Sequence, residues 1–212
     1  MKICVPFKYW QAALHCAAVD DIRYYLNGIH LNKNKIEATN GHVAYRATFG
    51  YWERDGVNYL NGQCGFVEQH ECNGEWPDII IGALGTKPTK SVQNKTVWLI
   101  IEKQEDSNEL TIRYLDRYSK VIYLQSAEKV EGRFPDFERI IPKGKVNKEQ
   151  FNIGFNPNYL ALPHKLLESE GDKFSGTVVM KAWDTNSAAT FELQRVAREC
   201  ESEVLIVMPK RI

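Results

Sequence analysis

Short runs of alternating apolar and polar positions cover most of the chain, and this period of two is typical of β-strands. Over the first fifty residues the pattern predicts strands at residues 1–6, 23–31, 35–39 and 43–49. It also predicts a helix over 8–19, because apolar residues recur at helical spacing among good helix formers. The first fifty residues therefore form a predicted unit of one strand, one helix and three strands.

The same unit recurs further along the chain. Its middle copy consists of predicted strands at 78–84, 97–102, 110–115 and 120–127, and the Gly- and Pro-containing segment 85–92 allows at most a short helical turn. Its last copy has strands at 150–155, 177–183, 188–194 and 204–209, and a helix from Pro157 to about Glu168 that Asn156 caps. Repetition of one supersecondary unit is the main architectural prediction.

Three segments depart from this unit. Residues 51–77 have no clean period, which predicts a long loop, and their aromatic residues (Tyr51, Trp52, Tyr59 and Phe66) make it a candidate interface. Residues 131–142 contain two prolines and are predicted to form an extended connector. Residues 202–212 form an apolar strand that needs a sheet or a groove to cover it, so Met208 and Pro209 are predicted to contribute to a binding surface.

Composition narrows the class of protein. The 212 residues include 27 Lys and Arg and 27 Asp and Glu, so the net charge of zero argues against a simple polyanion-coating protein, although a neutral total can hide a basic face. The five cysteines are scattered and odd in number, which fits reduced thiols. Because there is also no long apolar run, we expect a cytoplasmic protein.

Catalytic and metal-binding motifs are absent from the sequence. It contains no G-x-S-x-G, P-loop or H-E-x-x-H motif, so we expect neither an enzyme nor a cofactor. Cys64, His70 and Cys72 suggest a zinc site, but their spacing matches no common zinc finger and no fourth ligand is near. We therefore expect no metal.

Five short segments, taken together and in order, resemble the bacterial DNA polymerase III β sliding clamp family. They read DIRYYLNGIHL (21–31), EATNGHVA (37–44), EGRFPDFERIIP (131–142), IGFNPNYL (153–160) and IVMPKRI (206–212). The resemblance implies an α+β, DNA-clamp-like fold in which the repeated units form antiparallel sheets with helices on one face.

The resemblance also implies a domain division. Residues 1–128 resemble the complete middle domain of the family, 129–146 the following connector, and 147–212 the second half of the last domain. The first domain and the first half of the third, which include both faces of the usual subunit joint, have no counterpart. Such a shortened form would suit a phage or a mobile element.

In this family, partner proteins insert a short hydrophobic peptide into a pocket beside the connector. The residues that the resemblance places around this pocket are Leu26, Thr39, Gly41, His42, Ala44, Pro135, Arg139, Ile140, Ile206, Val207, Met208, Pro209 and Arg211. Any single strand residue of this set could equally be core. Val43 and Lys210 depart from the family pattern, and both change the polarity of the pocket, so peptide preference is expected to shift.

Contact with DNA has less support in the sequence. The candidate residues are Arg23, Tyr24, Tyr25, Lys87 and Lys90, since basic side chains bind phosphates and aromatic rings stack on bases. Packing within the sheet is an equally good account of the two tyrosines.

Three functions remain open at this point. The first is a reduced clamp that oligomerises into a ring and tethers a polymerase or another replication or repair protein to duplex DNA. The second is a clamp mimic that forms no ring and competes for clamp partners. The third is a structural protein that reuses the fold. The retained pocket favours the first two.

Overall fold

The computed structural model describes residues 1–54, 57–60, 72, 76–83, 87–103, 107–142, 153–168, 176–195 and 199–210. Its strands are β1 (Lys2–Pro6), β2 (Ile29–Lys33), β3 (Lys35–Thr39), β4 (Val43–Thr48), β5 (Tyr51–Arg54), β6 (Val57–Leu60), β7 (Trp76–Ala83), β8 (Trp98–Lys103), β9 (Glu109–Leu115), β10 (Val121–Val130), β11 (Gly176–Lys181), β12 (Ala189–Arg195) and β13 (Ser202–Val207). Its helices are α1 (Phe7–Leu14), α3 (Lys90–Lys95), α4 (Pro157–Leu160) and α5 (Leu162–Leu167), with 3-10 turns η1 (Tyr24–Leu26) and η2 (Phe137–Arg139).

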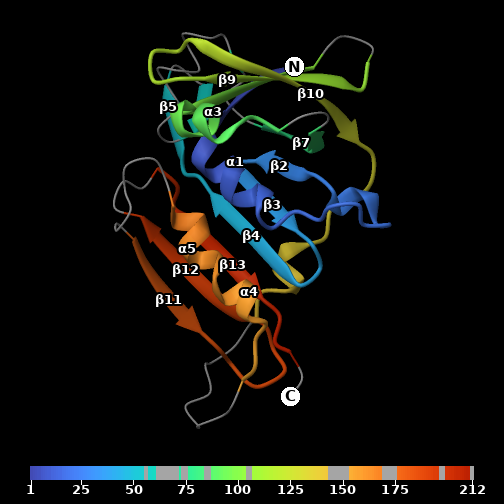
Figure 1. The fold of residues 1–212 in the computed structure, drawn as a ribbon, viewed down its shortest axis with the longest axis vertical. Coiled ribbons are helices and arrows are strands. Elements are labelled where there is room, and N and C mark those ends of the chain that lie inside the picture. Colours follow the sequence, from blue (N-terminus) through green and yellow to red (C-terminus); the bar gives the residue numbers. More distant parts are fainter. Residues whose placement is uncertain are drawn as a thin grey trace.

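Eleven of these strands form one antiparallel sheet, in the order β1-β8-β9-β10-β7-β2-β3-β4-β13-β12-β11 (Figure 1). The first two units interlock, because β1 pairs with β8 of the middle unit and β7 pairs with β2 of the first unit. The C-terminal strands join this sheet where β13 pairs with β4, in a register that runs from Ser202 opposite Thr48 to Val207 opposite Val43. β13 is thus docked in the sheet, as the apolar sequence over 202–212 predicts.

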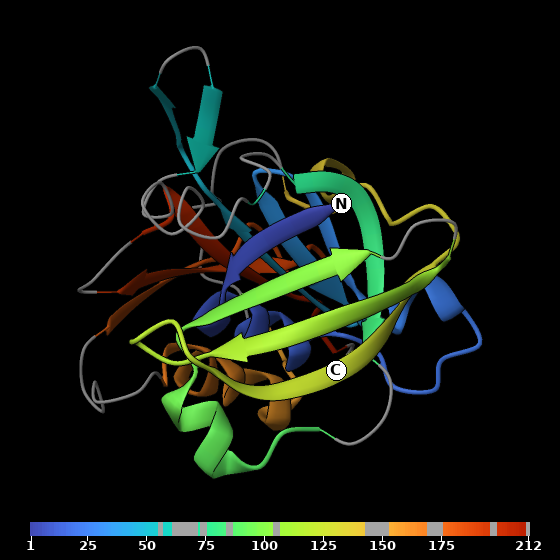
Figure 2. The same cartoon turned by 90° about the horizontal axis from the view of Figure 1, so that it is seen from above.

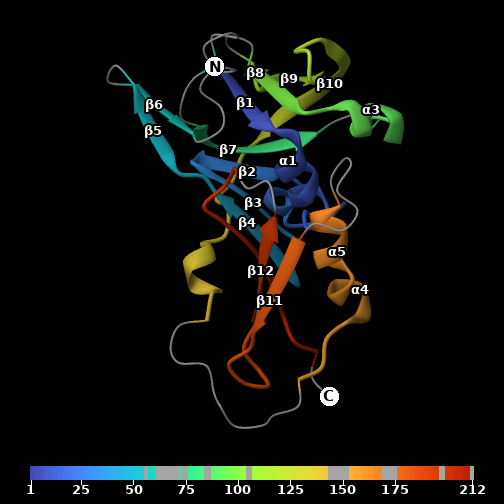
Figure 3. The same cartoon turned by 90° about the vertical axis from the view of Figure 1, so that its left-hand side faces the viewer.

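The larger of two apolar clusters among the described residues lies between the sheet and the helices. Tyr9 and Trp10 of α1 are fully buried in it, and α1 packs against β3 and β4 and contacts α5. Leu162 and Leu166 of α5 join the same core and contact β12. Figure 3 shows α1, α5 and α4 following one another beside β12 and β11.

A buried ion pair between β12 and β13 lies at the junction between the first unit and the C-terminal strands. Arg195 donates two hydrogen bonds to the carboxylate of Glu203, at 2.8 and 2.7 Å, and Tyr45 donates a third at 2.9 Å. The side chains of Arg195 and Glu203 are only 5% and 1% exposed. Arg195 also donates to the carbonyl of Leu166, so β4, β12, β13 and α5 all meet at this junction ion pair.

Several element predictions need correction. The predicted helix over 8–19 ends at Leu14, and the first part of the strand predicted over 23–31 is the turn η1. The helix from Pro157 breaks at Ala161 into α4 and α5, because Pro163 has no N–H to continue the hydrogen-bond ladder. Of the strand predicted over 150–155, residues 150–152 lie outside the described residues, and Gly154 forms only an isolated bridge with Lys210.

The loop predicted over 51–77 is also wrong in part. β5 and β6 form a two-stranded hairpin, and β7 begins at Trp76. Figure 2 shows this hairpin projecting away from the rest of the molecule. The other described part of the segment is Cys72, and Phe66 lies outside the described residues.

Candidate peptide-binding groove

The connector is anchored to the sheet by two buried aromatic residues. Phe134 and Phe137 stack on each other with ring centroids 6.2 Å apart. They belong to a small apolar cluster, here called the connector cluster, which consists of Ala44, Ile80, Phe134, Phe137, Ala188 and Ile206. The cluster brings the connector against β4, β7 and β13, so the position of the connector depends on the C-terminal strand.

A polar network holds the connector on one side of this cluster. His30, whose ring stacks on Phe134 at 4.6 Å, has Nδ1 2.8 Å from Glu37 Oε2 and Nε2 2.9 Å from Asp78 Oδ1. Arg46 donates to Glu37 at 2.6 Å and to Glu138 of the connector at 2.5 Å. The network therefore links β2, β3, β4 and β7 to the connector.

Both ring nitrogens of His30 face carboxylates, which accept hydrogen bonds but cannot donate them when ionised. Burial lowers the pKa of His30, but the hydrogen bonds and charges of Glu37 and Asp78 outweigh burial, so its pKa is raised above the ordinary value. The geometry and the pKa thus both favour an imidazolium that donates from both nitrogens.

This arrangement predicts a pH dependence of stability. Because the folded-state pKa of His30 is raised, its stabilisation is complete below the unfolded value of about 6.5 and is lost as pH rises through the higher folded value. Urea unfolding of wild type and His30→Gln, followed from about pH 6 to about pH 9, should show the difference between them shrinking with pH. The exposed His164→Gln variant should follow wild type, and a difference that grows with pH would contradict the assignment.

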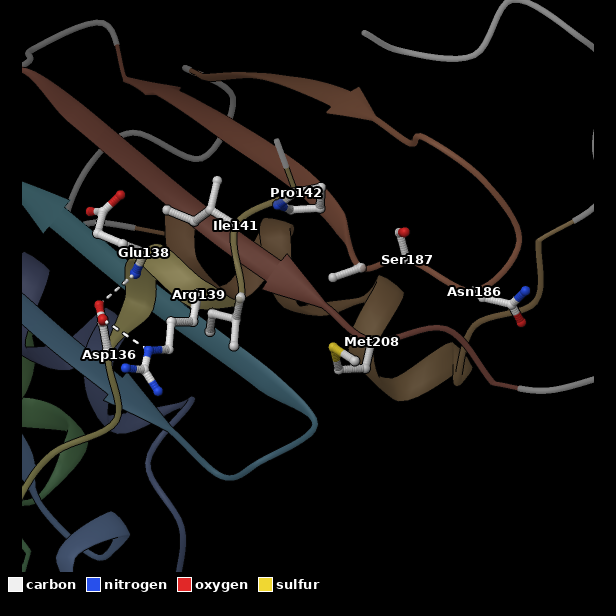
Figure 4. A pocket seen from close by; sticks show the side chains of 10 residues that line it. Asp136, Glu138, Arg139, Ile141, Pro142, Asn186, Ser187 and Met208 are labelled. Atoms are coloured by element: carbon white, nitrogen blue, oxygen red, sulfur yellow. Dashed lines mark hydrogen bonds and ion pairs between the residues drawn. The ribbon is translucent and has the colours of Figure 1, made fainter. Parts of the chain in front are cut away.

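Beside the connector lies an open groove of about 620 Å³, here called the connector groove. It is lined by Asp136, Glu138, Arg139, Ile140, Ile141, Pro142, Asn186, Ser187, Ala188 and Met208. Figure 4 shows the connector side chains on one side and Met208, Ser187 and Asn186 on the other. The volume is within the range of small-molecule sites, and the mixture of apolar wall and polar ends suits a short amphipathic ligand.

The charged residues at one end of the groove are held by local contacts. Asp136 accepts a hydrogen bond from the backbone N–H of Glu138 at 3.0 Å and caps the turn η2. It also pairs with the guanidinium of Arg139 at 3.4 Å (Figure 4). Most of the Arg139 side chain remains exposed, so it can still reach a ligand carboxylate or carbonyl.

The predicted pocket residues do not all line the connector groove. Arg139, Ile140 and Met208 line the connector groove, and Ala44 and Ile206 lie in the connector cluster beneath it. Pro135 lines a neighbouring cavity under the connector. Leu26, Thr39 and Val207 are buried, Gly41 and His42 form the exposed turn after β3, Pro209 is half-buried, and Arg211 lies outside the described residues.

The turn after β3 is tied to the end of β13. Met208 donates its backbone N–H to the carbonyl of His42 at 3.0 Å, and the His42 ring stacks on Tyr159 of α4 at 6.2 Å. Gly41 has a φ of +87°, which L side chains rarely adopt, so the turn needs a glycine there. These contacts position Met208 at the groove without placing His42 in it.

Other groove residues were not predicted. Asp136, Glu138, Ile141 and Pro142 lie within the predicted connector, but Asn186, Ser187 and Ala188 come from the connection between β11 and β12. In that connection Asp184 accepts hydrogen bonds from the backbone of Asn186 and Ser187, at 2.7 Å each. Such an Asp-initiated turn could be read from the sequence, but its position at the groove depends on the pairing of β12 with β13.

The candidate DNA-binding residues belong to two segments of the chain, one at the turn η1 and one at the start of the α3 region. Arg23 pairs with Asp21 at 2.7 Å, and Tyr24 and Tyr25 make an edge-to-face contact at 5.9 Å, with Tyr24 exposed and Tyr25 half-buried. Lys87 and Lys90 are exposed at the start of the α3 region.

The part of the chain that the structure describes has neither a metal-binding cluster nor a membrane-spanning helix. No group of three His, Cys, Asp or Glu there could hold a metal ion, and Cys64 and His70 lie outside the described residues. None of the described helices is long and apolar enough to cross a membrane.

Comparison with known proteins identifies the fold. No family model matches the sequence, and no curated protein matches it. Solved structures do match over the whole chain: a sliding clamp (DNA polymerase III subunit beta) from Bartonella birtlesii bound to griselimycin, at 17% identity and a TM-score of 0.55, and the sliding clamp from Pseudomonas aeruginosa, at 15% identity and 0.54. DNA polymerase III subunit beta from Borrelia burgdorferi, in complex with a natural product, matches at 13% identity and 0.55.

The chain spans only part of these proteins, namely 66% of the Bartonella chain, 63% of the Borrelia chain and 67% of the Pseudomonas chain. At these identities the likeness establishes the fold and not the function. The predicted class, repeated units that form antiparallel sheets in a DNA-clamp-like arrangement, is thereby confirmed. This protein has the fold of the bacterial DNA polymerase III β sliding clamps, to which its sequence segments are similar.

Proposed function

We propose that this protein is a clamp-like processivity factor or tether that binds short hydrophobic peptides of polymerases or other replication proteins in the connector groove. It acts by binding and not by catalysis. The observation that carries the proposal is the groove itself, where the connector and the end of β13 place apolar side chains opposite each other next to an exposed arginine. The clamp-like fold supports the same function.

The groove has the chemistry that peptide binding needs. Ile140 and Ile141 pack against the connector cluster and offer a partly buried apolar wall. Met208 faces it from the other side, and a flexible thioether adapts to different side chains. Burying two large peptide side chains would contribute about 3–6 kcal/mol before association costs, which supports weak to moderate affinity.

The direct test is a peptide titration. Met208→Ala combined with Pro209→Ala should weaken binding of a fluorescent hydrophobic Gln- and Leu/Phe-containing peptide by about tenfold, because it removes one wall of the groove. Unfolding midpoints in urea should stay close to wild type, since both positions are at least partly exposed. Leu124→Ala, an exposed apolar residue on β10, is the matched control. Unchanged peptide affinity in the double variant would rule out the groove.

Processivity requires DNA as a second ligand, and one basic group supports it. The pKa of His15 is lowered mainly by burial of the imidazole and further by the positive charges of Lys165 and Lys87. Lys165 and Lys87, from the regions of α5 and α3, are therefore close enough to affect His15, and the two lysines present positive charge suited to phosphates beside the carboxylate of Glu168, which raises the pKa of His15.

Duplex binding separates this function from the alternative of a clamp mimic that only competes for partners. A tether should bind duplex DNA in a salt-sensitive way that Lys87→Ala and Lys165→Ala reduce. A mimic should bind the peptide equally well and show no such binding. The zero net charge of the chain, with 27 Lys and Arg balanced by 27 Asp and Glu, is the observation that keeps the mimic as a second candidate.

A further inference from the structure

β11 lies at one end of the eleven-stranded sheet and exposes its outer edge. It pairs with β12 through all six of its residues, and on its other side no strand among the described residues pairs with it (Figure 1). An exposed edge carries unpaired N–H and C=O groups that can bind another strand. Natural edges are usually protected by proline, by a bulge or by an inward-pointing charge. β11 contains no proline, and its register with β12 is regular.

The apolar core reaches this edge without being closed there. Val178 and Met180 stand directly opposite Leu193 and Phe191 of β12, so they lie on the same face of the sheet as these two core residues. Val178 is nevertheless 38% exposed and Met180 is 52% exposed. Leu193 and Phe191 share the core with Leu162 and Leu166 of α5. The uncovered side chains therefore continue the core and do not belong to the solvent face.

The other exposed edges differ from β11. At the opposite end of the sheet, the carbonyl of Cys4 on β1 accepts a hydrogen bond from the Trp76 indole at 2.8 Å, and Ile3 to Pro6 are buried. Within the sheet, β10 pairs with β7 only from Ala127 to Val130, so the earlier part of β10 has an edge that no described strand covers. The register of β10 with β9 shifts there, between Val121 and Tyr123. A cap and an irregular register both hinder strand addition. Among the edges of the eleven-stranded sheet compared within the described residues, the edge of β11 is the one that is regular, exposed and apolar.

We propose that the occupant of this edge is a second copy of the same chain, bound by antiparallel pairing of β11 with β11 about a two-fold axis through Val179. A two-fold axis perpendicular to the sheet keeps the helix-covered faces of both copies on the same side. It requires Val178 of one copy to stand opposite Met180 of the other, and Thr177 opposite Lys181. The edge is self-complementary in this register, because each exposed apolar residue covers the other and no like charges are opposed.

The charge at the end of the strand fits this arrangement. Lys181 forms an ion pair with Glu192 of β12, so its ammonium is already neutralised within its own copy. In the proposed register, Lys181 of one copy stands opposite Thr177 of the other copy, so two lysines do not face each other. The dimer would unite the two C-terminal units into one continuous sheet with a shared core. Its interface does not include the residues that line the connector groove of either copy.

Cross-linking tests the register. Val179→Cys should give an efficient disulfide-linked or bis-maleimide-linked dimer under mild oxidant or reagent, because paired Cβ atoms across antiparallel strands lie about 4.5–5.5 Å apart. Thr177→Cys is the matched control, since its partner is Lys181 and the two cysteines are separated along the strands. Wild type sets the background from the native cysteines. Equal cross-linking of both variants would overturn the register.

Light scattering across a concentration series tests whether the edge of β11 forms the dimer interface. Wild type should show a monomer–dimer equilibrium, and Met180→Lys should raise the dissociation constant at least about tenfold, because the ammonium would be buried against apolar residues. Leu124→Lys on β10, where the side chain is 59% exposed, should leave the equilibrium unchanged. A monomer at all concentrations, or dissociation by Leu124→Lys and not by Met180→Lys, would overturn the proposal.

The test of the β11 dimer does not depend on the proposed function of the connector groove. Peptide affinity of Met180→Lys reports whether the variant is folded and whether the connector groove is intact. If Met180→Lys still binds the peptide but no longer forms the dimer, the β11 interface is supported. If wild type does not bind the peptide at all, the proposed function of the groove is refuted, and the light-scattering result on the dimer still stands.

Discussion

Replacing Glu203 by alanine is expected to lower the free energy of unfolding by about 3–5 kcal/mol, since removing one partner of a buried ion pair leaves the other charge uncompensated. Arg195 would keep its acceptor at the Leu166 carbonyl but lose both hydrogen bonds to the carboxylate. The hydroxyl of Tyr45 would lose its acceptor as well. Because these residues lie on β4, β12 and β13, the loss should loosen the docking of the C-terminal strands.

Urea unfolding at constant pH measures this effect. Glu201→Ala is the matched control. Glu201 stands two positions before Glu203 in the sequence and is exposed, so its replacement should change the free energy of unfolding by less than about 0.5 kcal/mol. The double variant Arg195→Met with Glu203→Leu should recover much of the loss, since apolar residues of similar volume often replace a buried ion pair without penalty. A Glu203→Ala protein as stable as wild type would show that the junction ion pair contributes little.

Replacing Phe137 by alanine is expected to release the connector and to abolish most peptide binding. The ring is buried, stacks on Phe134 and lies under the Arg46 guanidinium at 4.7 Å. Phe→Ala in a packed core costs about 3–5 kcal/mol. Here the cost falls on a short segment whose other anchors are Phe134 and the Arg46–Glu138 ion pair. Local undocking is therefore expected before global unfolding.

Limited trypsin digestion distinguishes the two kinds of unfolding. Cleavage after Arg133 and Arg139 in the connector should accelerate strongly in Phe137→Ala while the rest of the chain resists, and peptide titration should show a parallel loss of affinity. Phe137→Leu keeps an apolar side chain and should show a smaller change in both measurements. Normal peptide affinity together with rapid connector cleavage would mean that the connector is not part of the binding site.

The sequence predicts a strand well where apolar and polar residues alternate along it. The bounds of β3 and the docking of β13 follow from local patterns, since apolar positions on one face demand a partner. The hairpin of β5 and β6 was missed, although Asp55-Gly56 between two aromatic runs is a recognised turn signal. Composition masked this signal, because the surrounding segment is rich in glycine and asparagine.

The groove could be predicted only in part, because it is assembled from distant segments. Arg139, Ile140 and Met208 were reachable through the resemblance of their short motifs. Ser187 and Asn186 were not, since their place at the groove results from the register of β12 with β13. His30 and Glu37 look like solvated strand positions in the sequence, but both are buried in the structure, where Phe134 of the connector stacks on the His30 ring. Long-range pairing carries this information, and a local pattern does not.

The pairing of β4 with β13 has a consequence for how the chain reaches its folded state. Tyr45 and Glu203, which meet across this pair, are 158 positions apart in the sequence, and β1 must likewise find β8. Such distant contacts require closure of long loops before they gain any stabilisation, and proteins rich in them fold slowly, on the order of milliseconds to seconds. The connector cluster contains Ile206 and Ala44, so the connector groove can form only after this slow closure. Until then the edge of β4 is open, and a partially folded chain is most exposed to misassociation beside the segment that forms the connector groove in the folded protein.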